Sequence, residues 1–122
     1  MIYELLRHYR FEAAHQLPRV ANGHRCARLH GHTYGVEIVI KGPLDDSTGW
    51  VMDYSEIDQV VEPVLDQLDH QFLNEIEGLE NPTSEHVVRW LWGKLADELP
   101  HLAAVRVSEN SDSMCTYRGE DR

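Results

Sequence analysis

The sequence lacks the features that would place the protein in a membrane or in a disulfide-rich class. It has two cysteines in 122 residues, too few for a disulfide framework. No apolar run approaches the ~20 residues that a membrane-spanning helix needs, and the first residues contain no apolar core of a secretory signal. We therefore expect a cytoplasmic protein with no membrane partner, in a compartment where thiols stay reduced.

Basic residues are also scarce. Eleven Lys and Arg residues stand against 21 Asp and Glu residues, and the formal net charge is −10. Proteins that bind nucleic acid non-specifically neutralise its phosphates with an excess of Lys and Arg, so we expect no nucleic-acid partner. A small anionic substrate is not excluded, because Arg19, Arg25 and Arg28 form a local basic cluster.

The rest of the composition is that of an ordinary globular chain, with 42% hydrophobic and 26% charged residues. A chain of this length can bury a core without crosslinks. Because no internal repeat or boundary is visible, we expect residues 1–122 to form a single domain.

Two segments near the N-terminus alternate with the period of a β-strand. In residues 2–15, His15 shares the parity of the apolar side chains, and in residues 29–41 both His30 and His32 share the parity of Tyr34. If the two strands pair antiparallel, the end of the first lies beside the start of the second. His15 then comes within reach of His30 and His32.

The remaining pattern predicts two helices followed by two short strands. Asp53 is a candidate N-cap before an apolar stripe that Pro63 should kink or break, and Thr83 or Ser84 is the N-cap of a second helix that ends near Pro100. Strands are expected over residues 103–109 and 114–118. The order strand, strand, helix, helix, strand, strand predicts an α+β fold: an antiparallel four-stranded sheet with two helices on one face.

Three converging imidazoles with an open fourth position are typical of catalytic zinc. The sequence therefore predicts a metal site at His15, His30 and His32, although three imidazoles suit several divalent ions. Cys26, in the loop between the two strands, is either a fourth ligand or a free thiol with a lowered pKa. Cys115, within a strand pattern, is expected to be a small core residue.

Two further candidates carry weaker signals. Asp69 and His70 are adjacent in the sequence. They could form an acid/base pair in which the Asp69 carboxylate orients the His70 imidazole. Glu109 shares parity with Val105 and Val107, so its carboxylate points with apolar side chains and needs a partner. Such a carboxylate can accept two parallel N–H bonds from a pterin or guanine edge.

The chain resembles the 6-pyruvoyltetrahydropterin synthase family from about residue 3 to residue 119. The segments that carry the resemblance occur in the family's order: F-E-A-A-H, C-A-R-L-H-G-H, L-D-H-Q-F-L-N, N-P-T-S-E and the strand ending in Glu109. Three residues separate the cysteine from H-G-H, a spacing similar to that of the bacterial queuosine-pathway branch, the 6-carboxy-5,6,7,8-tetrahydropterin synthases. The presence of Cys26 disfavours a folate-linked variant that has glutamate there.

The resemblance implies a role for each candidate residue. His15, His30 and His32 would bind Zn²⁺, and Cys26 would be a general acid/base beside the substrate. Asp69 with His70 would be a second proton-transfer unit. The residues implied in substrate binding are Glu109 at the pterin ring, Thr83 and Ser84 in the pterin pocket, and Arg28 with its neighbouring arginines at the triphosphate.

The resemblance also implies a reaction and an assembly. The substrate would be 7,8-dihydroneopterin triphosphate, and the products 6-carboxy-5,6,7,8-tetrahydropterin, acetaldehyde and triphosphate. The fold would be the tunnelling fold, whose sheets join in trimers that stack into a homo-hexamer with active sites between subunits. Two alternatives stay open: a pyruvoyl-forming synthase using the same substrate, and a non-catalytic zinc or pterin-binding protein in which Cys26 closes the metal site.

Overall fold

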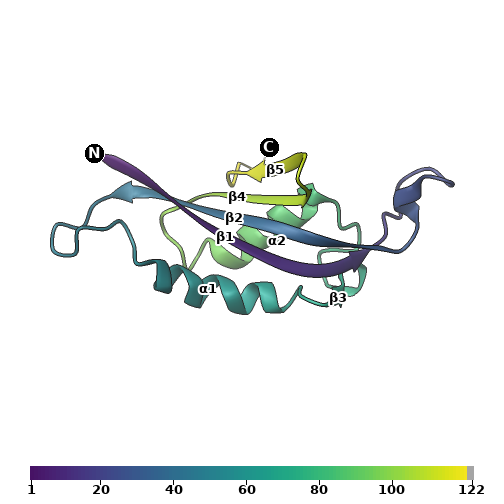
Figure 1. Ribbon diagram of the computed structural model, residues 1–122, viewed down its shortest axis with the longest axis horizontal. Helices are drawn as coiled ribbons and strands as arrows, with labels where there is room; N and C mark the ends of the chain where they lie inside the picture. The colour runs from purple at the N-terminus through teal and green to yellow at the C-terminus, as the bar shows by residue number, and fades with distance from the viewer. Residues whose placement is uncertain (121–122) are drawn as a thin grey trace.

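A five-stranded sheet is the framework of the computed structural model, which describes residues 1–120 (Figure 1). Its strands lie in the order β3-β1-β2-β4-β5. Their bounds are β1 Ile2–His15, β2 His30–Pro43, β3 Gln71–Phe72, β4 Leu102–Asn110 and β5 Ser113–Tyr117. All neighbours pair antiparallel except β3, which runs parallel to β1.

The long pairing of β1 with β2 confirms the predicted hairpin. Its register runs from Ile2 opposite Pro43 to His15 opposite His30. Alternate side chains of both strands point to one face, and Phe11 stacks on Tyr34 there with ring centroids 4.7 Å apart. Because this face is buried, a one-residue slip would expose the whole apolar set, which fixes the register.

Both helices cover that apolar face (Figure 1). Helix α1 spans Tyr54–Asp66 and α2 spans Ser84–Leu95, and their buried side chains belong to the same core cluster as those of β1, β2 and β4. Each helix has the expected kind of cap, because Asp53 accepts a hydrogen bond from the backbone N–H of Ser55 and Thr83 accepts one from that of His86. Among residues 1–120, no helix is both long and apolar enough to cross a membrane.

A partly buried ionic cluster joins α1 to β1. Arg7 donates from Nε and Nη2 to the two carboxylate oxygens of Asp58, at 2.9 and 2.7 Å, and the Tyr9 hydroxyl donates to the same carboxylate at 2.5 Å. Two parallel N–H bonds give this contact a fixed geometry. The helix is therefore held in one position relative to the strand that carries His15.

The predicted fold class is confirmed, with three differences in detail. Strand β3 makes the sheet mixed and five-stranded, and with two residues it is too short to show a period. Helix α2 ends at Leu95, before the predicted limit at Pro100. Helix α1 runs through Pro63 to Asp66 without a broken turn. Two short 3-10 helices, Arg25–Ala27 and Leu73–Glu75, lie in the connections.

Candidate metal centre and substrate site

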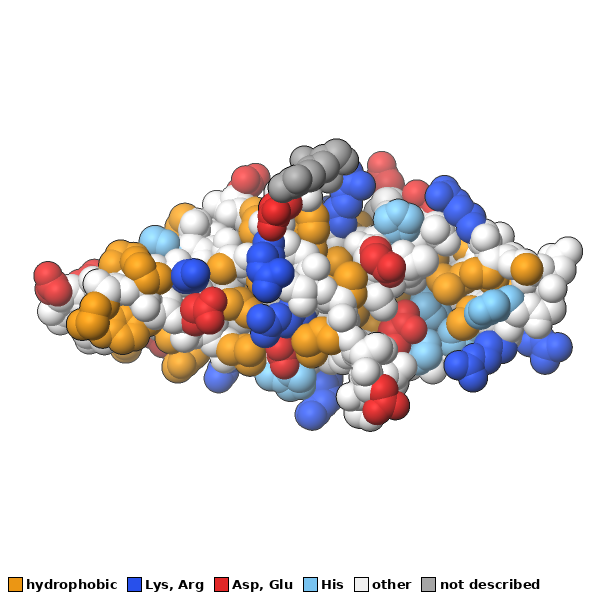
Figure 2. Space-filling view, turned by 90° about the horizontal axis from the view of Figure 1, so that it is seen from above, with side chains coloured by type: hydrophobic (Ala, Val, Ile, Leu, Met, Phe, Trp, Pro, Cys, Tyr) orange, Lys and Arg blue, Asp and Glu red, His pale blue; other side chains and the backbone are white. Residues whose placement is uncertain are grey.

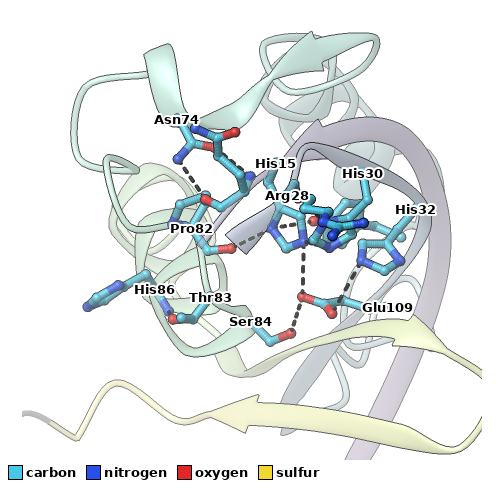
Figure 3. Close-up of polar contacts among 12 residues, drawn as sticks. His15, Arg28, His30, His32, Asn74, Pro82, Thr83, Ser84, His86 and Glu109 are labelled. Carbon is cyan, nitrogen blue, oxygen red and sulfur yellow. Dashed lines mark hydrogen bonds and ion pairs between the residues drawn. The ribbon is translucent and has the colours of Figure 1, made fainter. Parts of the chain in front are cut away.

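The three predicted histidines meet at one end of the β1–β2 hairpin (Figure 3). One ligand nitrogen from each of His15, His30 and His32 lies within 4.8 Å of the other two. His15 Nε2 and His30 Nε2 are 2.9 Å apart. His15 is fully buried, and the other two are partly exposed. The convergence predicted from strand parity is confirmed.

The chemistry of these nitrogens fits a divalent metal ion. His32 Nε2 is a buried nitrogen with no hydrogen-bond partner among the described residues, and such a group costs free energy unless a ligand satisfies it. Burial lowers the pKa of both His15 and His32. Both imidazoles are therefore neutral near pH 7, the form in which histidine binds metals.

Backbone carbonyls orient two of the three rings. His15 Nδ1 lies 2.9 Å from the Pro82 carbonyl oxygen, and His30 Nδ1 lies 2.6 Å from that of Arg28. A ring that donates Nδ1–H to a carbonyl keeps a lone pair on Nε2, which here points into the cluster. Sequence reasoning missed both carbonyls, because a backbone acceptor leaves no signal in residue types.

Glu109 completes the inner surface of the cluster. Its carboxylate oxygens lie 3.5 Å from His32 Nε2 and 4.0 Å from His15 Nε2, and one of them accepts a hydrogen bond from the Ser84 hydroxyl at 3.1 Å (Figure 3). The parity argument therefore placed this carboxylate on the correct face of β4. A negative charge so near three imidazoles favours a cation between them.

A hollow of about 320 Å³ opens beside this carboxylate. Glu109 and Ser84 lie on its wall, and the sheet side is formed by Val107 and Cys115. Cys115 also packs against the core, and burial raises the pKa of its thiol. A planar, polar molecule in the hollow would lie beside the Glu109 carboxylate.

Cys26 is not a member of the metal-ligand group. It lies in the 3-10 helix Arg25–Ala27, where its backbone N–H donates to His24 Nδ1 and its carbonyl accepts from the N–H of Leu17 at 2.7 Å. The second contact folds the loop back toward the end of β1. The thiol is free and half-buried.

Asp69 and His70 form the predicted pair, with His70 Nδ1 2.9 Å from an Asp69 carboxylate oxygen. The pair is anchored to β1, because the Glu12 N–H donates to Asp69 at 2.9 Å and its carbonyl accepts from the His70 N–H. The first of these hydrogen bonds, and then the one from His70, lower the pKa of Asp69.

The His70 imidazole projects into solvent, with 76% of its side chain exposed. Its backbone has a φ of 59°, a left-handed conformation that costs free energy for any residue except glycine. No described contact joins this pair to Cys26, but His70 borders the same hollow as His32.

Other predicted residues border the site less directly. Thr83 and Ser84 begin α2 next to Pro82, and the side chain of Arg28 is exposed beside His30. Figure 2 shows histidine side chains gathered beside an acidic one on one face, with basic side chains at the adjoining end of the molecule. This part of the surface therefore presents both acidic and basic side chains to a ligand, although the net charge of the chain is negative.

Asn74 is a positioning residue that sequence reasoning missed. It lies in the segment L-D-H-Q-F-L-N and makes two hydrogen bonds with the backbone of Gln16, accepting from the N–H at 3.0 Å and donating to the carbonyl at 2.7 Å. These two bonds fix the backbone of the residue after His15. The only sequence signal for this residue was an amide side chain in a segment with no clear helix or strand period.

The chain is similar to known proteins over most of its length. Residues 4–120 match the family model described as 6-pyruvoyl tetrahydropterin synthase. The chain is 36% identical to the 6-carboxy-5,6,7,8-tetrahydropterin synthase of Synechocystis, over 93% of this chain and 91% of that one, and 37% identical to a putative enzyme of the same name from Archaeoglobus fulgidus, over 88% and 89%. The structure of the Caenorhabditis elegans 6-pyruvoyl tetrahydropterin synthase is similar, with a TM-score of 0.91 at 26% identity over 98% of this chain and 97% of that one.

Proposed function

The chain belongs to the 6-pyruvoyl tetrahydropterin synthase family, and from that premise we propose that this pterin synthase is a zinc-dependent carbon–carbon lyase. It has the α+β tunnelling fold of the family. The proposed reaction converts 7,8-dihydroneopterin triphosphate and water to 6-carboxy-5,6,7,8-tetrahydropterin, acetaldehyde and triphosphate. The observation that carries the proposal is the cluster of three imidazoles beside the Glu109 carboxylate.

His15, His30 and His32 would hold the metal through their Nε2 atoms, with one face left open. When bound, zinc would supply a Lewis acid that lowers the cost of negative charge developing on the substrate's side-chain oxygens. The carbonyls of Pro82 and Arg28 orient two of the rings for this task. Since the ligands come from paired strands, the register of the hairpin fixes the relative positions of their backbones.

Glu109 would bind the 2-amino and N3 edge of the pterin by two parallel N–H bonds. Ser84 supports this role, because its hydroxyl already donates to the same carboxylate and holds it in place. The adjacent Thr83 caps α2 and fixes the start of the helix that borders the pocket. Arg28, together with Arg19 and Arg25, would bind the triphosphate.

Cys26, Asp69 and His70 would move protons to and from the substrate side chain. The thiol and the imidazole are general acid/base groups suited to this task. Because the Asp69–His70 pair is exposed and makes no described contact with Cys26, we propose that the pair serves the site of a neighbouring subunit. This arrangement requires an oligomer, which we propose to be a homo-hexamer in which unpaired edges of the sheet join between subunits.

We propose that this reaction takes place in the cytoplasm, as a step of queuosine biosynthesis. The test is to incubate the zinc-loaded protein with 7,8-dihydroneopterin triphosphate and to identify pterin and carbonyl products by mass spectrometry. We expect 6-carboxytetrahydropterin and acetaldehyde in equal amounts. Turnover that releases triphosphate without acetaldehyde would contradict the proposal.

A second candidate is formation of 6-pyruvoyltetrahydropterin from the same substrate. The structural similarity to the Caenorhabditis elegans 6-pyruvoyl tetrahydropterin synthase favours it. The two reactions differ in the fate of the side chain, because only the first cleaves it to acetaldehyde. The same mass analysis therefore separates them.

A non-catalytic zinc or pterin-binding protein is the third candidate. It requires the Cys26 thiol to close the metal site, whereas the ligand group in the described structure consists of the three histidines. The variant Cys26→Ala distinguishes the two cases. Loss of zinc together with the thiol would favour the closed site, and retention of zinc with loss of turnover would favour the enzyme.

A further inference from the structure

The hydrogen-bond partners of His15 cannot all be satisfied by a neutral ring. His30 Nδ1 faces the Arg28 carbonyl at 2.6 Å, and a carbonyl only accepts, so His30 carries its hydrogen on Nδ1. The hydrogen between His15 Nε2 and His30 Nε2, 2.9 Å apart, must then come from His15. That leaves His15 Nδ1 without a hydrogen.

His15 Nδ1, however, faces two different partners. The Pro82 carbonyl lies 2.9 Å away and needs an N–H donor, while the Tyr34 hydroxyl lies 3.1 Å away and can donate to a bare nitrogen. Both partners are buried, as is His15. A doubly protonated ring would satisfy every contact, but burial disfavours a cationic ring.

If Nε2 of His15 and Nε2 of His30 held a metal ion, the conflict would be removed. Neither Nε2 would then need a hydrogen, and His15 would carry its hydrogen on Nδ1. We propose that His15 exchanges tautomers with metal occupancy: the metal-free ring accepts from the Tyr34 hydroxyl, and the metal-bound ring donates to the Pro82 carbonyl. This inference rests on the metal site of the proposed function.

The exchange links the metal to the pterin pocket. Pro82 directly precedes Thr83, which caps α2, and Ser84 at the start of that helix donates to Glu109. When His15 donates to the Pro82 carbonyl, it fixes the backbone from which the helix begins. Metal binding therefore orders the residues that hold the Glu109 carboxylate.

Tyr34 is the positioning residue that stabilises the metal-free state. Among the described residues, His15 Nδ1 is the hydrogen-bond partner of its hydroxyl. Once Nδ1 carries a hydrogen, the Tyr34 O–H has no acceptor there and is left buried without one. Removing this hydroxyl should therefore strengthen metal binding, whereas a group that merely supports the site would weaken it when removed.

The first test is NMR of the ¹⁵N-labelled full chain, recorded without metal and with one equivalent of Zn²⁺. Long-range ¹H–¹⁵N correlations show which ring nitrogen of His15 carries the hydrogen. We expect the hydrogen on Nε2 without metal and on Nδ1 with zinc. Hydrogen on Nδ1 in both states, or on both nitrogens without metal, would overturn the proposal.

The second test is zinc affinity, measured by competition with a chromophoric chelator. Tyr34→Phe keeps the ring that stacks on Phe11 and should bind Zn²⁺ roughly two- to tenfold more tightly than the wild type, the effect of about one hydrogen bond. Tyr9→Phe removes a partly buried hydroxyl that is bonded to Asp58 and should leave the affinity unchanged. Equal or weaker binding by Tyr34→Phe would refute the exchange.

Zinc binding and the state of the His15 ring distinguish failure of the metal site from failure of the tautomer exchange. A wild-type chain that binds no zinc would remove the metal site of the proposed function, and the tautomer exchange with it. A wild-type chain that binds zinc while His15 keeps one tautomer would refute the exchange alone. The proposed reaction would then stand on its product analysis.

Discussion

Replacing His32 with alanine should separate metal binding from folding. His32 Nε2 is buried without a hydrogen-bond partner among residues 1–120, and such a nitrogen costs about 1–3 kcal/mol. The side chain of His32 is 23% exposed, so truncation also removes packing contacts, and their loss costs a free energy of similar size. We expect the free energy of unfolding of the metal-free His32→Ala variant to lie within about 1 kcal/mol of the wild-type value.

The effect of zinc should be much larger. A ligand that binds only the folded state stabilises it by about 2.7 kcal/mol at a free concentration of 100 times its Kd. For a domain of this size, that corresponds to a rise in Tm of about 10 °C. The wild type should show this rise, and His32→Ala should lose nearly all of it.

Thermal unfolding followed by circular dichroism, with zinc and with a chelator, measures both quantities. His8→Ala is the control, because His8 lies on the opposite face of β1 beside Glu37 and should leave the zinc-induced rise intact. The reasoning would be refuted if His32→Ala kept the rise. It would also be refuted if the metal-free variant lost several kcal/mol, because His32 would then be an ordinary core residue.

Three further predictions concern other groups. Glu109→Gln keeps the size of the side chain but turns one hydrogen-bond acceptor into a donor, so it should raise KM for the pterin at least tenfold. Zinc affinity, measured by chelator competition, should fall by a smaller factor. A larger loss of zinc affinity than of pterin affinity would make Glu109 a metal ligand. Asp58→Asn should cost about 1–2 kcal/mol in urea unfolding, because it weakens the contacts with Arg7 and Tyr9. Hydrogen bonds from Arg7, and then Tyr9, lower the pKa of Asp58 in the folded state. The contribution of Asp58 to the free energy of unfolding is therefore present above about pH 4 and is lost as the pH falls below that value. Asp58→Asn should flatten this part of the wild-type profile of stability against pH, and an unchanged profile would contradict this role of Asp58. Cys26→Ser should retain zinc, by metal analysis of the purified protein, and lose at least a hundredfold in kcat if the thiol transfers a proton.

Local periodicity determined much of this protein from sequence alone. The parity of His15, His30 and His32 along two strands was enough to predict their convergence, because the side chains of paired strands alternate with a fixed period. The same rule placed Glu109 with the inward side chains of β4. Both helices and their caps followed from spacing and from Asp53 and Thr83.

The tertiary structure decided what period and residue type do not encode. Strand β3 exists because the backbone around Asp69 and His70 docks on the edge of β1, a contact between segments more than fifty residues apart. The carbonyls of Pro82 and Arg28, which select the ring nitrogens of two ligands, are backbone atoms common to every residue. A sequence can therefore name the candidate metal ligands, whereas the groups that set their tautomers appear only when distant backbone segments meet.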